Sequence, residues 1–128
     1  MKKFSPSDAC VKLNPHLFKT DKKEWRESLK DPMNKLERAF ASRLNVLQMN
    51  GSIHRWVFEG VTLHWGGGMR YTPDFLIVDK ETMMTLVEIK GFRRSRDIVR
   101  FKGCKNEWDW CFNFEMWARE DGQWTRLY

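Results

Sequence analysis

The chain has 128 residues, a formal net charge of +6 and a sequence pI of about 9.4. A chain of this length buries one core and has little room for a second. Aromatic residues make up 14% of the sequence, which excludes a wholly disordered chain. The basic balance favours a polyanionic partner such as nucleic acid.

No apolar run approaches the roughly 18 residues of a membrane-spanning helix, and no long basic amphipathic helix predicts binding to a membrane surface. The initial Met-Lys-Lys is followed by polar residues, so we expect no signal peptide. Cys10, Cys104 and Cys111 are odd in number and widely spaced, which is typical of free thiols in a reducing cytoplasm. Their spacing, and that of the three histidines, does not predict a zinc site.

Residues 1–31 are polar and interrupted by turn signals, and we interpret them as an N-terminal arm. Ser5-Pro6 predicts a short helix that ends at Asn14-Pro15, and residues 20–30 predict a second, weak helix. The arm packs on the domain, mediates a dimer or contacts DNA; a solvated basic face is the simpler alternative. Its basic residues are Lys19, Lys22, Lys23 and Arg26.

The domain proper is expected over residues 32–128 and begins with a helix. Asp31 is predicted as the N-cap of a helix that runs to about Gln48 and ends at Asn50. An apolar stripe with a period near 3.6 faces the core. It consists of Met33, Leu36, Phe40, Leu44 and Leu47. Glu37 lies at the border of this stripe and reaches the sheet if the helix packs on it; an ordinary surface glutamate is the alternative.

Residues 53–65 alternate as a strand, in which Gly60 marks a bulge or a break. Three glycines follow at 66–68. No Gly-Lys-Ser/Thr and no helix come after them, so we expect a hairpin loop and not a phosphate-binding loop. His64 and Arg70 flank this loop and are expected near the active centre.

Two apolar strand-like runs, 71–78 and 84–89, are joined by a polar turn at 79–82. Asp74, Glu88 and Lys90 are charged where strands covered on both faces should be apolar. Glu88 and Lys90 share a face because strand side chains alternate. Antiparallel pairing of the two runs brings Asp74 near Glu88.

Neighbouring carboxylates repel each other, and a divalent cation removes that repulsion. Mg²⁺ needs only one or two carboxylates besides water and substrate phosphate. Lys90 would orient the attacking water or offset charge on a phosphate. In the alternative interpretation Asp74 caps a turn after Pro73, while Glu88 and Lys90 line a solvated edge.

Thr72-Pro73-Asp74-Phe75, followed by Val87-Glu88-Ile89-Lys90-Gly91, resembles the signature of the PD-(D/E)XK nucleases. The wording is most similar to phage junction-resolving enzymes of the endonuclease I type, and the resemblance covers about residues 35–118. It implies a restriction-endonuclease-like fold and a Mg²⁺ cofactor that Mn²⁺ can replace. It also implies that Lys90 is catalytic, and that Asp74, Glu88, the Ile89 carbonyl and Glu37 hold the metal.

The chain is strongly basic after Lys90. Ser95 is predicted as the N-cap of a helix through about Trp108, with Ile98 and Phe101 facing the core. The predicted DNA-binding residues are Arg70, Arg93, Arg94, Arg96, Arg100, Lys102 and Lys105. Arginine favours phosphate because its guanidinium binds phosphate in a bidentate manner. A solvated helix face is the alternative.

Residues 111–118 predict a further strand, 119–122 a hairpin turn and 123–128 a closing strand. The expected fold is α/β: a helix, a three-stranded antiparallel meander, a crossover helix and further strands in a mixed sheet. The expected function is Mg²⁺-dependent endonucleolytic cleavage of branched DNA by a homodimer. The alternatives are a nicking or general DNA nuclease, an inactive DNA-binding module, or a chain that needs a partner subunit.

Overall fold

The computed structural model describes residues 31–91 and 95–128, so the helices predicted in the arm and its four basic residues lie outside the described residues. The chain divides into Met1–Pro32 and Met33–Tyr128, and all described elements belong to the second unit. They are α3 (Lys35–Met49), β1 (Ile53–Phe58), β2 (Leu63–Trp65), β3 (Met69–Tyr71), β4 (Phe75–Asp79), β5 (Met84–Lys90), α4 (Ser95–Trp108), β6 (Asn113–Glu120) and β7 (Gln123–Arg126).

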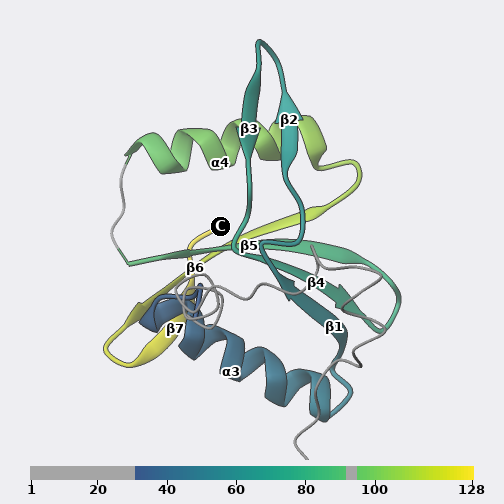
Figure 1. Ribbon diagram of the computed structural model, residues 1–128, viewed down its shortest axis with the longest axis vertical. Coiled ribbons are helices and arrows are strands. Elements are labelled where there is room, and N and C mark those ends of the chain that lie inside the picture. Colours follow the sequence, from purple (N-terminus) through teal and green to yellow (C-terminus); the bar gives the residue numbers. More distant parts are fainter. Residues whose placement is uncertain (1–30, 92–94) are drawn as a thin grey trace, which may run out of the picture. The chain divides into compact units, whose positions relative to one another are not determined.

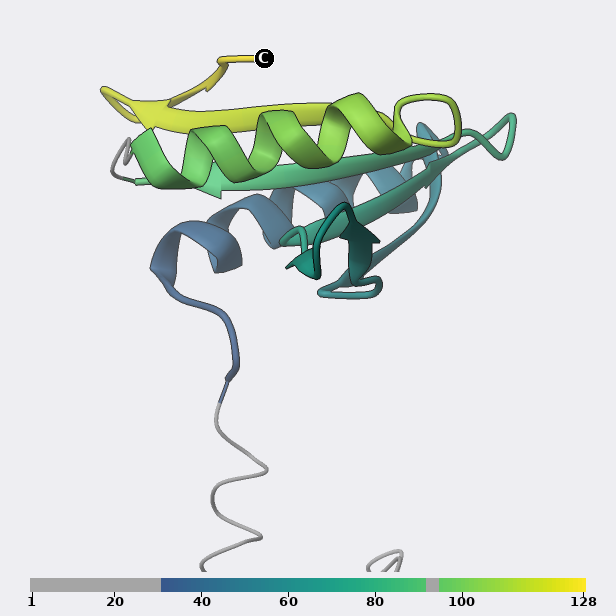
Figure 2. The ribbon, with the colours of Figure 1, turned by 90° about the horizontal axis from the view of Figure 1, so that it is seen from above.

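Five strands form a mixed sheet in the order β1-β4-β5-β6-β7. The strands β1, β4 and β5 are antiparallel neighbours, and α4 carries the chain across to β6, which pairs in parallel with β5. Helix α3 covers one face of the sheet and α4 the other (Figures 1 and 2). The α/β class, the mixed sheet and the crossover helix are therefore confirmed.

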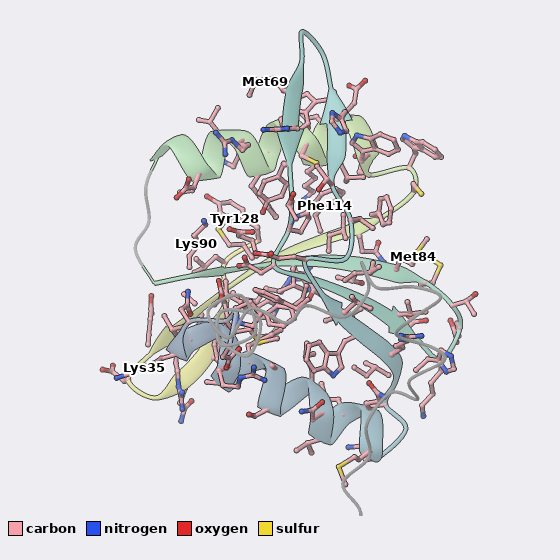
Figure 3. The ribbon with its side chains drawn as sticks, in the orientation of Figure 1. Lys35, Met69, Met84, Lys90, Phe114 and Tyr128 are labelled. Atoms are coloured by element: carbon pink, nitrogen blue, oxygen red, sulfur yellow. The ribbon has the colours of Figure 1, made fainter. Side chains whose placement is uncertain are left out.

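Successive side chains of β5 point to opposite faces of the sheet, so this strand contributes to the apolar packing on both faces. Leu86 belongs to a buried cluster with Phe101 of α4 and Phe114 of β6, and Phe114 lies between the sheet and α4 (Figure 3). Val87 and Ile89 belong to the opposite cluster, which contains the apolar stripe of α3. A strand covered on both faces is apolar throughout. Glu88, in the middle of this strand, is therefore an exception that needs a local explanation.

The predicted start of the first helix is wrong. The N-cap is Asn34 and not Asp31, because Asn34 and Glu37 form a reciprocal capping box: Asn34 Oδ1 accepts from Glu37 N at 2.9 Å, and Glu37 Oε2 accepts from Asn34 N at 2.8 Å. An N-cap at Asp31 would have no acidic residue three positions later, so the later start satisfies one more backbone N–H group.

Two strand predictions also need correction. The run 53–65 breaks after Phe58, which is one of the two outcomes expected at Gly60. The run 71–78 is not one strand, because Tyr71 ends β3 and Phe75 begins β4. Pro73 lies in the connection between them and has no backbone N–H to donate to a ladder. Strands β2 and β3 instead form a separate two-stranded sheet.

The turns and the last strands follow the predictions closely. At the 79–82 turn, the Asp79 carboxylate accepts from the backbone N–H groups of Glu81 and Met83 at 2.8 and 3.0 Å. At the tip of the β2–β3 hairpin, the backbone angle φ is positive at Gly66 and Gly68. The strand predicted over 111–118 is β6 at Asn113–Glu120, so the hairpin turn is shorter than the predicted 119–122, and the closing strand β7 ends at Arg126 and not at residue 128.

Cys104 is buried and Cys111 is partly buried, and both are free thiols. Burial raises the pKa of Cys104 to about 11, so its thiol is protonated and unreactive near neutral pH. Among residues 31–91 and 95–128, no helix is long and apolar enough to cross a membrane.

Candidate active site

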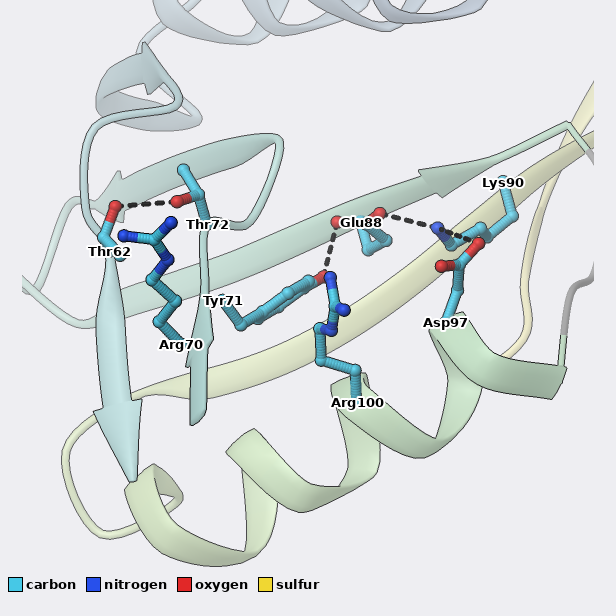
Figure 4. A pocket seen from close by; sticks show the side chains of 8 residues that line it. All are labelled: Thr62, Arg70, Tyr71, Thr72, Glu88, Lys90, Asp97 and Arg100. Carbon is cyan, nitrogen blue, oxygen red and sulfur yellow. Dashed lines mark hydrogen bonds and ion pairs between the residues drawn. The ribbon is translucent and has the colours of Figure 1, made fainter. Parts of the chain in front are cut away.

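A polar pocket of about 470 Å³ opens on the α4 side of the sheet (Figure 4). Strand β5 contributes Glu88 and Lys90 to its lining, and α4 contributes Asp97 and Arg100. The remaining lining residues come from the β2–β3 hairpin and its flanks. They are Thr62, Arg70, Tyr71 and Thr72. Segments from three parts of the sequence therefore meet at the charged end of β5.

Glu88 is the one buried charged residue in the described part of the chain, with 8% of its surface exposed. Its Oε1 accepts from Lys90 Nζ at 2.7 Å, and its Oε2 accepts from the Tyr71 hydroxyl. The ammonium of Lys90 also lies 3.5 Å from Asp97 Oδ2. The predicted shared face of Glu88 and Lys90 is thus confirmed, and each oxygen of the buried carboxylate has a donor.

Both donors hold their protons firmly. Burial by itself lowers the pKa of Lys90, but the hydrogen bond to Glu88 and the charges of Glu88 and Asp97 outweigh burial and raise it. Burial, followed by the charge of Glu88, raises the pKa of Tyr71 well above its ordinary range. Lys90 is therefore a charged ammonium and Tyr71 a neutral hydroxyl donor near neutral pH.

Asp74 lies immediately before β4 and is tied to the neighbouring strand. Its Oδ2 accepts from the Ile89 backbone N–H at 2.8 Å. Burial and then repulsion by Glu88 raise the pKa of Asp74 to about 7, although the bond from Ile89 works in the opposite direction. The prediction that strand pairing brings Asp74 near Glu88 is confirmed, because Phe75 pairs with Val87 and the Asp74 carboxylate accepts from the backbone of Ile89, the residue after Glu88.

Glu37 approaches the same region from the first turn of α3. Its charge adds a smaller repulsion that also raises the pKa of Asp74. Close packing positions this turn, since a Cβ atom on Gly91 would lie only 3.0 Å from Leu36 Cδ1. The glycine after Lys90 therefore permits the close approach predicted there. The Glu37 carboxylate itself is engaged in the capping box with Asn34.

The side chains at this site are of the type that binds a divalent cation. Asp74 and Glu88 offer hard oxygen ligands and repel each other, and Mg²⁺ needs few protein ligands. Among the described residues, Asp74 Oδ1 has no hydrogen-bond donor. Both oxygens of Glu88 are hydrogen-bonded, so metal binding would rearrange its contacts with Lys90 or Tyr71. No three His, Cys, Asp or Glu side chains gather as a metal site within residues 31–91 and 95–128.

The predicted DNA-binding residues are distributed unevenly. Arg70 and Arg100 line the pocket. Lys102 lies over the ring of Tyr128, with Nζ 4.9 Å from its centroid, and Lys105 lines a different pocket of about 390 Å³. Arg93, Arg94 and the side chain of Arg96 lie outside the described residues.

His64 does not line the pocket that contains Glu88, although the sequence places it near the active centre. Its backbone carbonyl accepts from Trp108 Nε1 at 3.0 Å, which fastens β2 to the end of α4. The contact of His64 with α4 is therefore a backbone hydrogen bond that holds β2 in place.

Sequence reasoning missed the contacts of Tyr71 and Asp97 with the charged pair on β5. A weak signal existed for each residue. Tyr71 is three positions before Asp74 in the motif segment, and Asp97 is in the first turn of the helix that follows Lys90. Neither signal predicts a contact with Glu88 or Lys90, because both contacts depend on how the hairpin and α4 pack over β5.

Two comparisons with known proteins give no relative for this chain. No protein-family model matches the sequence. A search of curated proteins likewise finds no significant match.

Proposed function

We propose that this chain is a metal-dependent DNA endonuclease with a restriction-endonuclease-like fold of the PD-(D/E)XK type. One observation carries the proposal. Asp74 and Glu88, which 13 residues separate in the sequence, come together: Asp74 Oδ2 accepts from the backbone N–H of Ile89, between Glu88 and Lys90. A chance match of two short motifs would not require this contact.

Asp74, Glu88 and the Ile89 carbonyl would hold Mg²⁺ or Mn²⁺, with Glu37 as a further ligand once it leaves its capping bond. The bound cation would supply a Lewis acid that makes water more acidic and offsets negative charge on a phosphate. Tyr71 holds Glu88 in place by its hydrogen bond. Lys90 keeps its proton and presents a positive charge at the pocket, where it stabilises the charge that develops on the attacked phosphate.

DNA is the proposed substrate because the protein carries a net charge of +6 and its pocket contains Arg70 and Arg100. The motif wording favours branched DNA as the substrate. If the chain is of phage or prophage origin, it would act in the cytoplasm of the bacterial host. The described part of the chain contains one such site, and resolution of a four-way junction needs two symmetric cuts. A homodimer is therefore part of this proposal.

A cleavage assay with Mg²⁺ or Mn²⁺ tests the proposal, with wild-type protein compared against Asp74→Asn. The substrates are a four-way junction, a flap, a single strand and a linear duplex of matched sequence. We expect the wild type to make paired symmetric cuts in the junction and Asp74→Asn to make none. The variant should bind DNA as tightly as the wild type does. Asp109→Asn, which changes an exposed carboxylate in the same way, is the control and should cut normally.

Cuts in every substrate would support the nuclease assignment and contradict selectivity for junctions. Light scattering that shows a monomer at tens of micromolar, with and without junction DNA, would contradict the resolvase assignment.

A second candidate is a DNA-binding module in which the charged residues are structural. The observation in its favour is that Lys90 and Tyr71 already satisfy both oxygens of Glu88. Calorimetric titration with Mg²⁺ in the presence of DNA separates the two candidates. Heat of binding that disappears in Asp74→Asn supports the endonuclease, while no binding by the wild type supports the module.

A further inference from the structure

The β2–β3 hairpin and its flanks line the pocket beside α4 (Figure 4). Its two strands make a sheet of their own, and the side-chain oxygens of Thr62 and Thr72 lie 2.7 Å apart where the chain enters and leaves it. Trp65 and Trp108 fasten it to α4 through apolar packing and a backbone hydrogen bond. The hairpin is therefore held in place, so Arg70 on β3 faces the pocket from a fixed support.

Charge balance in the pocket singles out its two arginines. The carboxylates of Glu88 and Asp97 both face Lys90, at 2.7 and 3.5 Å from its Nζ. Arg70 and Arg100 are exposed and have no ion pair with any described residue. Among the described residues, these two guanidinium groups that line the same pocket therefore have no counter-charge, and such a pair is suited to binding an anion.

We propose that Arg70 and Arg100 form a subsite for a phosphate of the bound strand, next to the phosphate that is attacked. Guanidinium groups bind phosphate through paired N–H donors, which gives orientation as well as attraction. Thr62 and Thr72 add a donor, because two hydroxyls that share one hydrogen bond leave one O–H hydrogen free for a third oxygen. The identity of the ligand as a DNA strand rests on the proposed function.

The size of the pocket agrees with this ligand. About 470 Å³ lies within the range of sites for single small molecules, so the pocket admits one nucleotide unit and not the width of a duplex. The strand would lie across the opening of the pocket, with one phosphate at the arginines and its neighbour at Glu88 and Lys90. The hairpin is then the part of the fold that sets the position of the strand relative to the cut.

The experiment measures binding without metal, so that it does not depend on cleavage. Fluorescence anisotropy with a labelled single-stranded oligonucleotide, in excess chelator and at several salt concentrations, gives the affinity and its salt dependence. The variants are Arg70→Gln, Arg100→Gln and both together. Arg55→Gln removes the same charge from an exposed position on β1 that does not line the pocket, and it serves as the matched control.

We expect each pocket variant to weaken binding roughly tenfold, since a charge-assisted hydrogen bond to phosphate is lost. The slope of log affinity against log salt should fall by about 0.7 in the double variant, which loses the one shared phosphate contact on a single strand. The double variant should lose less than the product of the two single losses, because both arginines hold the same phosphate. Arg55→Gln should leave the affinity and the slope almost unchanged.

Pocket variants that behave like Arg55→Gln would overturn the subsite, and independent, multiplicative losses would overturn a shared phosphate. A parallel titration with inorganic phosphate separates a free ligand from a strand: arginine-dependent binding of phosphate, with no binding of the oligonucleotide, would overturn the DNA assignment. Arginine-dependent strand binding by a protein that cuts nothing would uphold the subsite and refute the endonuclease.

Discussion

Burial of Asp74 beside Glu88 predicts that the metal-free protein loses stability as the pH rises from about 4 to 7. The ordinary pKa of this carboxyl is 3.8, and in the fold it is about 7. The folded state therefore binds the proton more tightly than the unfolded state does. The stabilisation is complete below pH 3.8 and is lost as the pH rises through 7. At 1.36 kcal/mol for each tenfold difference in proton affinity, the loss is at most about 4 kcal/mol.

The substitution Asp74→Asn isolates this contribution because it removes the charge and keeps a carbonyl oxygen that can accept from the Ile89 N–H. We expect the variant to be about 2–4 kcal/mol more stable than wild type at pH 8 and equal to it near pH 4. Urea unfolding in the presence of chelator measures the free energy of unfolding at each pH. Asp109→Asn, at an exposed position, should follow the wild type throughout.

Parallel pH profiles for wild type and Asp74→Asn would refute the reasoning, because they would mean that Asp74 ionises in the fold as it does in the unfolded chain. Saturating Mg²⁺ should restore stability to the wild type at pH 8 and leave Asp74→Asn unchanged, since only the native carboxylate pair binds the ion. An equal gain in the free energy of unfolding of both proteins would mean that the ion binds at another site.

Three further predictions follow from the packing around the pocket. Tyr71→Phe leaves a buried oxygen of Glu88 without its donor, and we expect urea unfolding to show a loss of about 1–3 kcal/mol; no loss would mean that water replaces the hydroxyl. Asp97→Asn removes a charge that raises the pKa of Lys90, so an NMR titration of the Lys90 ammonium should show a lower pKa than in wild type. Phe75→Ala empties a fully buried position against α3 and should cost about 3–5 kcal/mol, whereas a cost below about 1 kcal/mol would contradict the described core.

Helices and strands with a strong period of apolar residues were predictable, because those residues are the ones that pack in the core. Helix α4 ends at Trp108 as predicted, although Ser95, predicted as its N-cap, is already its first helical residue, and β5 ends at Lys90, one residue after the predicted end. The start of α3 was not predictable from a single cap residue, since Asp31 and Asn34 are both good N-caps. Only the reciprocal bond with Glu37, three positions after Asn34, decides between them.

The β2–β3 hairpin shows why local sequence patterns were insufficient elsewhere. Residues 71–78 have the composition of one strand, but Tyr71 packs with Phe101 of α4 and Phe75 packs in the cluster of α3. The intervening residues carry the chain from one sheet to the other, which no alternation rule foresees. The same step places the Tyr71 hydroxyl at Glu88, so the contact that the sequence did not reveal results from this topology.

The arrangement of charge around the pocket argues for function more strongly than any single residue does. Asp74, Glu88 and Asp97 bring three carboxylates to the end of β5, and Lys90 is the one cation paired with them among the described residues. Burying uncompensated charge costs stability, so a site selected for stability alone would replace it with apolar groups. Arg70 and Arg100 line the same pocket and have no ion pair with any described residue. A negative centre with a positive rim repels a lone phosphate from the centre and a lone cation from the rim. The arrangement is complementary to a cation and a phosphate together, and this complementarity supports the proposed function.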